Sequence, residues 1–209
     1  MLINKTNAKQ MTNPRIACDT PAQEADQRPS AQLKKLLRAD LLARRKAFDP
    51  KGKSISDELI GRRLLDWCAS HAIASLGVYH PIRGEPDLLP AYNALTARGV
   101  HLSLPVVRAK DAPLDFRHWI PGTPLEKDTL GMLVPPATAP SVTPQALLVP
   151  CLGYSSAGLR LGYGGGFYDR TLAGAPRPMT VGVCYSFGLI EIEGETHDVP
   201  LDLILTDAV

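Results

Sequence analysis

The sequence predicts a single-domain α/β protein with three layers, in which helices flank a largely parallel central sheet. Short and strongly apolar runs, such as 146–151 and 180–186, alternate with helical stretches along the chain. Such alternation is typical of parallel strands buried between two layers of helices. A chain of 209 residues, 44% hydrophobic and 21% charged, is also long enough to bury a core without disulfide or metal crosslinks.

The first 30 residues have a different character. They contain no aromatic residue, three prolines, and no helical or strand period. A segment of this composition buries too little apolar surface to offset the conformational entropy of ordering it. We therefore expect a disordered or loosely attached extension over 1–30 and an ordered domain over 31–209.

Residues 31–48 predict the first helix of the domain. Its apolar side recurs at the helical period and consists of Leu33, Leu37, Leu41 and Phe48. Lys34, Arg38 and Arg45 gather on an adjacent side. The interval 34–46 holds six positive residues and one negative residue, whereas the whole chain has a net charge of only +2. The basic character is therefore local, and the chain as a whole is too balanced for a general polyanion binder.

Two further helices are expected in the first half of the domain. One spans 54–71, where Ser54 and Asp57 have the spacing of a capping pattern. The other spans 87–98, with Gly99 placed just beyond its end.

The strands are predicted from short apolar or alternating runs bounded by turn residues. They are expected at 75–80, 100–104, 114–119, 146–151, 180–186 and 201–206. Pro81 and Pro105 are expected to end the first two. Between Pro121 and Pro144 prolines are dense, which predicts a long ordered loop over the surface.

Cysteine usage and hydropathy indicate a soluble cytoplasmic protein. The four cysteines form no C-x-x-C pair, and no histidine stands at zinc-ligand spacing from them. We expect free thiols in a reducing compartment. No apolar run reaches the roughly 20 residues needed to cross a bilayer, and the N-terminus lacks the apolar core of a secretory signal.

The strongest functional signal lies at 158–170, directly after the apolar strand 146–151. Its glycines allow positive φ and leave backbone N–H groups able to point at a ligand. Such a nest before a helix binds anions through oriented amides and the helix dipole. Arg160 adds a guanidinium suited to phosphate or carboxylate, and a carboxylate at Asp169 can hold Mg²⁺ against a bound polyphosphate.

The same residues leave plainer roles open. The segment is not a Walker A loop, since no Gly-Lys-Ser/Thr follows, and a forced G-x-G-x-x-G match is weak evidence for a dinucleotide site. The glycines could serve tight packing alone, and Asp169 could cap the following helix. Lys34 and Arg38 could form a solvated helix face.

The run at 160–170, which reads RLGYGGGFYDR, resembles the signature of the 5-formyltetrahydrofolate cyclo-ligase family, also called methenyltetrahydrofolate synthetase. Lys34-x-x-x-Arg38 resembles the basic opening helix of that family, and Glu85 resembles its folate-contacting glutamate. Two more segments, 114–119 and 196–202, resemble its mid-chain strand and its C-terminal His-Asp segment. The resemblance covers residues 31–207. The chain departs from the common pattern at Leu88, where Thr is frequent, and at Tyr154-Ser155, where Phe-Asp is frequent.

The resemblance implies an ATP-dependent cyclo-ligase of folate one-carbon metabolism. In this reaction 5-formyltetrahydrofolate is converted to 5,10-methenyltetrahydrofolate, and ATP is hydrolysed to ADP and phosphate with Mg²⁺ present. The implied partners are these small molecules, with no nucleic acid and no membrane. A monomeric state in the cytoplasm is expected.

The resemblance also implies roles for individual residues. The implied catalytic residues are Arg160 and Tyr168. The implied ATP-binding set is Lys34, Lys35, Leu36, Leu37, Arg38, Arg160, Leu161, Gly162, Tyr163, Gly164, Gly165, Gly166, Phe167 and Tyr168. The implied folate-binding set is His80, Glu85, Tyr163, Gly164, Gly165, Gly166 and Phe167. The implied metal ligands are Asp169 and Asp198.

Some of these residues have another interpretation from local sequence alone. Asp198 before Val-Pro is typical of a turn, His80 beside Pro81 of packing at a strand end, and Glu85 of an exposed side chain. Two other functions also stay open. One is a binding protein for folate or nucleotide without turnover, and the other is a nucleic-acid module suggested by the basic helix. The second lacks interleaved aromatic residues and any module signature.

Overall fold

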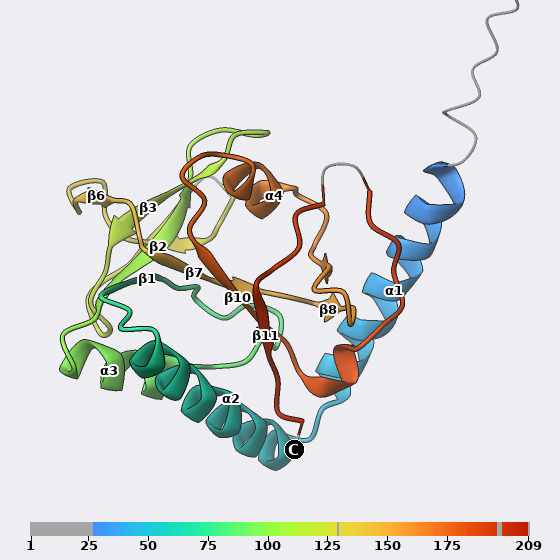
Figure 1. Cartoon of the computed structure of the whole chain (residues 1–209), viewed down its shortest axis with the longest axis horizontal. Helices are drawn as coiled ribbons and strands as arrows, with labels where there is room; N and C mark the ends of the chain where they lie inside the picture. The colour runs from blue at the N-terminus through green and yellow to red at the C-terminus, as the bar shows by residue number, and fades with distance from the viewer. Residues whose placement is uncertain (1–26, 129, 196–197, 209) are drawn as a thin grey trace, which may run out of the picture.

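The computed structural model describes residues 27–128, 130–195 and 198–208 (Figure 1). Most of the expected N-terminal extension therefore lies outside the described residues. The first helix, α1, spans Gln27–Ala47 and so already includes the last residues of that segment.

The centre of the fold is a seven-stranded sheet in the order β11-β10-β7-β1-β2-β3-β6. Its strands are β1 Ser75–Gly77, β2 His101–Val107, β3 Leu114–His118, β6 Ser141–Val142, β7 Ala146–Pro150, β10 Met179–Val183 and β11 Leu203–Leu205. The strands from β11 to β2 pair in parallel, and β3 and β6 join in antiparallel pairing. The expected largely parallel sheet is confirmed.

Helices cover both faces of this sheet. The helices after α1 are α2 Pro50–Ser70, α3 Leu89–Ala97 and α4 Phe167–Leu172, followed by the short 3₁₀ helix Ser186–Gly188. The side chains of β7 show which helices pack on each face of the sheet, because successive side chains of a strand point to opposite faces. Ala146 and Leu148 belong to the core cluster that contains α2 and α3, whereas Leu147 and Val149 pack in the cluster that contains Leu172 of α4. Figure 1 shows α2 and α3 below the strands and α4 above them, which confirms the three layers.

Helix α2 begins earlier than the sequence suggests. The side chain of Asp49 accepts a hydrogen bond from the backbone N–H of Gly52 at 2.8 Å, and Pro50 opens the helix. An acidic N-cap followed by proline is a favourable helix start. The prediction of a start at Ser54 is therefore wrong, and Ser54 and Asp57 lie inside the helix.

Strand β2 continues through Pro105, so the prediction that this proline ends the strand is wrong. The pairing with β1 extends only to Ser103, while the pairing with β3 continues to Val107. Beyond Ser103 the strand has a partner on one side only. A proline is tolerated there because the strand has no second neighbour with which the missing N–H would have formed a hydrogen bond.

The described residues of the proline-rich interval form short strands, in place of the continuous loop that was expected. β4 Glu126–Lys127 pairs with β5 Leu133–Val134, and β6 forms the edge of the main sheet. A last pair, β8 Gly153–Tyr154 with β9 Arg160–Leu161, forms a small hairpin that leads into the glycine loop.

Two expectations about the class of protein can be compared with the described residues. Cys68, Cys151 and Cys184 are free and buried, and Cys18 lies outside the described residues. Burial raises the pKa of the Cys68 thiol to about 12, opposed by the charge of Arg98. Within the described ranges, no helix has the length and apolar character that a membrane crossing requires.

We expect Gly77→Ala to destabilise the sheet strongly. A Cβ at this position would lie 2.6 Å from Leu147 Cδ2 and 2.9 Å from Phe116 Cε1. Overpacking of this kind costs about 1–3 kcal/mol, which lowers the melting temperature by roughly 2–12 °C in a chain of this size. Thermal unfolding followed by circular dichroism measures the change. Gly174→Ala is the control, since its Cβ would meet only an ordinary contact at 3.5 Å. Equal melting temperatures for the two variants would contradict the prediction.

Candidate functional site

One face of α1 carries basic residues into the protein. Leu41 is fully buried, Arg45 is only 4% exposed, and Lys34 and Arg38 are half-buried. These positions recur every three to four residues, which places them on one side of a helix. The expected apolar side is only partly correct, because Leu33 is 51% exposed.

Lys34 joins α1 to the segment near the C-terminus. Its Nζ donates to Glu195 Oε1 at 2.8 Å and to Asp198 Oδ2 at 3.2 Å. Burial acts to lower the pKa of Lys34, but these two carboxylates outweigh it and raise the pKa above its usual value. The backbone N–H of Asp198 also donates to Glu195 O at 3.0 Å. The contact of Asp198 with Lys34 is one that sequence alone did not indicate.

The glycine loop lies between β9 and α4, as the sequence predicts. Gly164 and Gly166 have φ values of 92° and 65°, a conformation that glycine adopts without steric cost. Arg38 Nε donates to Gly162 O at 2.9 Å, and a Cβ at Gly164 would stand 3.6 Å from the Arg38 guanidinium carbon. The loop is therefore shaped against a basic side chain of α1.

Arg160 and Asp169 form a tight ion pair at the start of α4. Arg160 Nη2 donates to Asp169 Oδ1 at 2.5 Å, and Nη1 donates to Val199 O at 3.2 Å. The Arg160 side chain is only 6% exposed. The N-cap of α4 is Gly166, so the alternative that Asp169 caps this helix is wrong. Arg160 thus connects α4 to the residue that follows Asp198.

Glu85 is buried against the same loop. It is 2% exposed, so the interpretation of Glu85 as an exposed side chain is wrong. Tyr163 Oη donates to Glu85 Oε1 at 2.9 Å, and the backbone N–H of Ile82 donates to Oε2 at 2.9 Å. Arg45 Nη1 donates to Tyr163 Oη at 3.0 Å. Burial raises the pKa of Glu85, while the hydrogen bonds and the charges of Arg45 and Arg83 oppose the rise.

The other predicted residues are placed less centrally. Lys35 and Leu36 are exposed on the outer side of α1. His80 is half-buried three residues after β1. Tyr168 packs against the cluster around Leu172, and burial raises the pKa of its hydroxyl. Of the remaining predicted positions, Leu37 packs beside Leu41 and Leu161 is buried, whereas Phe167 lies under the Arg170 guanidinium at 5.0 Å.

Sequence reasoning did not include Arg45 and Glu195 in the site. Arg45 could have been found, because it shares the helical side of Lys34 and Arg38 at a spacing of seven residues. Glu195 carries no comparable signal, since its contact with Lys34 spans 161 positions of the chain.

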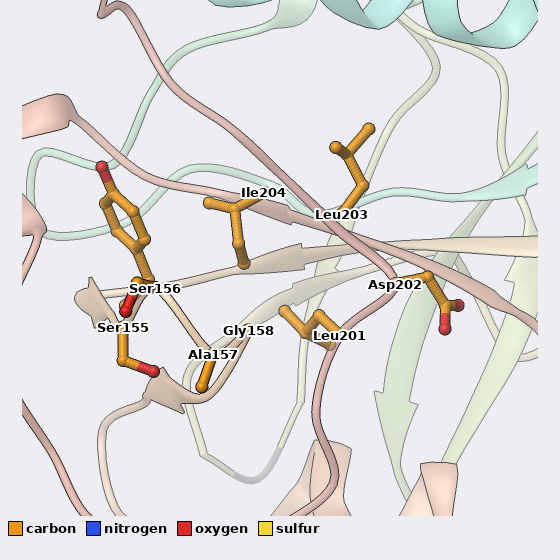
Figure 2. Close-up of a pocket in the computed structure, with 9 residues that line it drawn as sticks. Ser155, Ser156, Ala157, Gly158, Leu201, Asp202, Leu203 and Ile204 are labelled. Atoms are coloured by element: carbon orange, nitrogen blue, oxygen red, sulfur yellow. The ribbon is translucent and has the colours of Figure 1, made fainter.

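A separate pocket of about 420 Å³ lies beside the β8–β9 hairpin and β11 (Figure 2). Two of its polar side chains form hydrogen bonds within the protein. Ser155 Oγ accepts the N–H of Leu159 at 3.3 Å, and Asp202 Oδ2 accepts both the N–H and the hydroxyl of Thr180 at 2.8 Å. These groups join neighbouring segments, so the candidate site is the one formed by α1, the glycine loop and Glu85.

No group of three or more His, Cys, Asp or Glu side chains positioned to hold a metal occurs within the described ranges. The two predicted metal ligands instead face cations, Asp169 with Arg160 and Asp198 with Lys34. Any metal at this position would therefore need oxygen ligands from a bound molecule.

The chain is similar to proteins that act on folates. A model of the 5-formyltetrahydrofolate cyclo-ligase family matches residues 30–207. The 5-formyltetrahydrofolate cyclo-ligase of Mycolicibacterium smegmatis is 35% identical over 137 residues, covering 61% of this chain and 71% of that protein. The enzyme of the same name from Escherichia coli is 29% identical over 171 residues, covering 78% and 94%. The solved structure of 5,10-methenyltetrahydrofolate synthetase from Aquifex aeolicus has a TM-score of 0.72 at 26% identity, with 84% of this chain and 90% of that chain covered.

Proposed function

Because the chain belongs to the 5-formyltetrahydrofolate cyclo-ligase family, we propose that it cyclises 5-formyltetrahydrofolate to 5,10-methenyltetrahydrofolate and hydrolyses ATP to ADP and phosphate with Mg²⁺. The observation that carries the proposal is the meeting of three separate segments. Basic residues of α1, the glycine loop and the buried Glu85 contact one another through hydrogen bonds of 2.9–3.0 Å.

The phosphates of ATP would lie against Lys34, Arg38 and Arg160. Phosphoryl transfer requires mainly positioning and neutralisation of charge. Lys34 lies against two carboxylates, and Arg160 lies against one. Both cations therefore already bind anionic oxygen atoms, and the oxygen atoms of a phosphate are of the same kind. The backbone of residues 162–168 would supply N–H donors.

We propose that Asp169 and Asp198 would contribute to a Mg²⁺ site that a bound phosphate completes. Mg²⁺ is typically bound through one or two carboxylates together with phosphate oxygens and water, and the donor set here consists of two carboxylates beside the basic residues. When bound, Mg²⁺ offsets the negative charge of the phosphate oxygens. Arg160, which donates to Asp169 and to Val199, would keep the two ligand segments together.

The folate would be recognised by Glu85. An ionised carboxylate can accept paired N–H bonds from an aminopyrimidinone edge, and burial at 2% exposure strengthens such bonds by excluding water. His80, Tyr163 and Phe167 would also contact the folate. The glycine loop contacts both Glu85 and the basic residues of α1. The formyl group would therefore lie between the folate subsite and the phosphates.

In the proposed reaction the formyl oxygen attacks the γ-phosphate, and ADP leaves. N10 of the folate then attacks the activated carbon, and phosphate leaves with the proton lost from N10 as the ring closes. Arg160 would stabilise charge on the transferred group. The Tyr168 hydroxyl is protonated at neutral pH, as a tyrosine normally is, and burial raises its pKa further, so it would serve as a hydrogen-bond donor. Cytoplasmic localisation and a monomeric state remain predictions.

An absorbance assay tests the proposal directly. Purified protein is mixed with 5-formyltetrahydrofolate, ATP and Mg²⁺, and the near-ultraviolet band of the methenyl product is followed. Product should form only when all three are present, so omission of ATP or of Mg²⁺ is the control. Folded protein that binds 5-formyltetrahydrofolate in calorimetry but makes no product would contradict the proposal and support a binding protein without turnover.

A further inference from the structure

A chain of hydrogen bonds links three parts of the site through side chains. Arg45 of α1 donates to Tyr163 Oη at 3.0 Å, and Tyr163 donates to Glu85 Oε1 at 2.9 Å. The second oxygen of Glu85 accepts the backbone N–H of Ile82 at 2.9 Å. Arg45 is itself held by Cys151 O, to which its Nη2 donates.

The two bonds to Glu85 orient its carboxylate without using all of its acceptor capacity. An ionised carboxylate has about four lone-pair positions on two oxygens. Among the described residues, each oxygen of Glu85 accepts one hydrogen bond, Oε1 from Tyr163 and Oε2 from the backbone of Ile82. One acceptor position is therefore left on each oxygen. Together, these two positions can accept two parallel N–H donors, which is the pattern of an aminopyrimidinone edge.

Burial of Arg45 points to a role beyond packing. The residue is 4% exposed, and its Nε is buried with no hydrogen-bond partner among the described residues. Removing a guanidinium from water is costly unless other groups compensate for it. Here the negative charge of Glu85, to which Arg45 is linked through Tyr163, compensates for the buried charge of Arg45. Its neighbour on the helix, Arg44, is half-exposed, with 48% of its side chain accessible.

We propose that Arg45 and Tyr163 are positioning residues, which hold the Glu85 carboxylate in the orientation that recognises the paired N–H groups of the folate. This inference rests on the proposed function. Arg83 lies two residues before Glu85 in the chain, and its guanidinium lies 5.3 Å from the centre of the Tyr163 ring. This contact would help to hold the ring in place.

Several charged or titratable groups face Glu85. Its ionised form is favoured by the Ile82 N–H, Tyr163, Arg45 and Arg83, and is disfavoured by burial. The hydroxyl groups that sense its charge are Tyr79, Tyr92, Tyr163 and Tyr168. Loss of the Tyr163 hydroxyl removes one favourable interaction, so the pKa of Glu85 should rise further. Only the ionised form of Glu85 accepts both N–H bonds of the folate. When the pH is lowered, folate recognition should therefore be lost at a higher pH in this variant than in the wild-type protein.

The test compares Tyr163→Phe with the wild-type protein in the absorbance assay. Losing a hydrogen bond to a charged group corresponds to roughly tenfold or more in affinity. We expect the KM for 5-formyltetrahydrofolate to rise about tenfold and the KM for ATP to stay within about twofold. The acid limb of the pH profile of kcat/KM for the folate should move to higher pH. Tyr154→Phe is the matched control, since its hydroxyl bonds with Thr206, outside this chain of bonds.

Arg45→Lys provides the second variant, with Arg44→Lys as its control on the exposed side of the helix. Lysine keeps the positive charge but cannot reach both Tyr163 and Cys151 in the same way. We expect a rise in the folate KM in Arg45→Lys and none in Arg44→Lys. Circular dichroism checks that each variant is folded, and Arg45→Lys decides the question if Tyr163→Phe does not fold.

The outcomes separate this inference from the proposed function. No product from the wild-type protein would contradict the proposed function itself. Product from the wild type, with an unchanged folate KM and an unmoved acid limb in Tyr163→Phe or Arg45→Lys, would overturn only the positioning role. A fall in melting temperature with the same kinetic constants would also overturn it, because it would assign these residues to stability alone.

Discussion

Arg160→Ala is expected to lower turnover by about 10²–10³-fold, the range seen when a preorganised donor to a transition-state anion is removed. The KM for ATP should rise more than the KM for the folate, because Arg160 contacts Asp169 of α4 and Val199, where we propose that the phosphates bind. The variant also leaves Asp169 without the partner that now stands at 2.5 Å. We therefore expect a loss of about 1.5–3 kcal/mol in the free energy of unfolding.

Steady-state kinetics and chemical denaturation measure the two effects of Arg160→Ala. Arg177→Ala is a matched control, because Arg177 also pairs with an aspartate, Asp202, at 3.1 Å, but both side chains are more than a third exposed. An exposed pair of this kind contributes about 0–1 kcal/mol. Wild-type turnover and an unchanged KM for ATP in Arg160→Ala would remove Arg160 from the proposed phosphate site.

Asp169→Asn is expected to lower turnover by about 10²-fold at fixed Mg²⁺. Asparagine keeps the size of the side chain but lacks the charge that both Mg²⁺ and Arg160 require. The half-maximal Mg²⁺ concentration should rise, and added Mg²⁺ should restore part of the activity. Titrating Mg²⁺ at saturating ATP and folate measures this shift.

Asp40→Asn is the control for the charge change. Asp40 is exposed on α1 and lies 3.9 Å from Arg44, outside the site. It should keep the wild-type Mg²⁺ dependence. An unchanged Mg²⁺ dependence in Asp169→Asn, with the fold intact by circular dichroism, would show that Asp169 is not a metal ligand.

Much of the fold is predictable from the sequence because its signals are local. The apolar runs around β7 and β10 indicate buried parallel strands, and the glycine-rich run indicates a loop before a helix. Element ends are less well predicted, since they depend on neighbours. Pro105 continues a strand because β1 has already ended at Gly77, and only the sheet contains that information. Asp49 starts α2 through one hydrogen bond that competes with the Ser54 pattern.

The candidate site shows the same division. Lys34, Arg38 and Arg160 follow from residue type and spacing, helped by the resemblance to a family. The depth of Glu85 could not be predicted, because its surroundings come from Tyr163, which is 78 positions away in the chain. Arg45 was visible as part of a basic helix face, but its burial depends on Cys151 and Tyr163 closing over it.

The long sequence separations within the site have a consequence for how the protein is made. The bonds of α1 reach forward by 118 positions from Arg45 to Tyr163, by 124 from Arg38 to Gly162 and by 164 from Lys34 to Asp198. A ribosome adds roughly 5–20 residues per second, so α1 emerges many seconds before its last partner. Until those partners are made, Lys34, Arg38 and Arg45 lack the contacts that they have in the folded protein. A chain that stops short of Asp198 would leave Lys34 without that carboxylate.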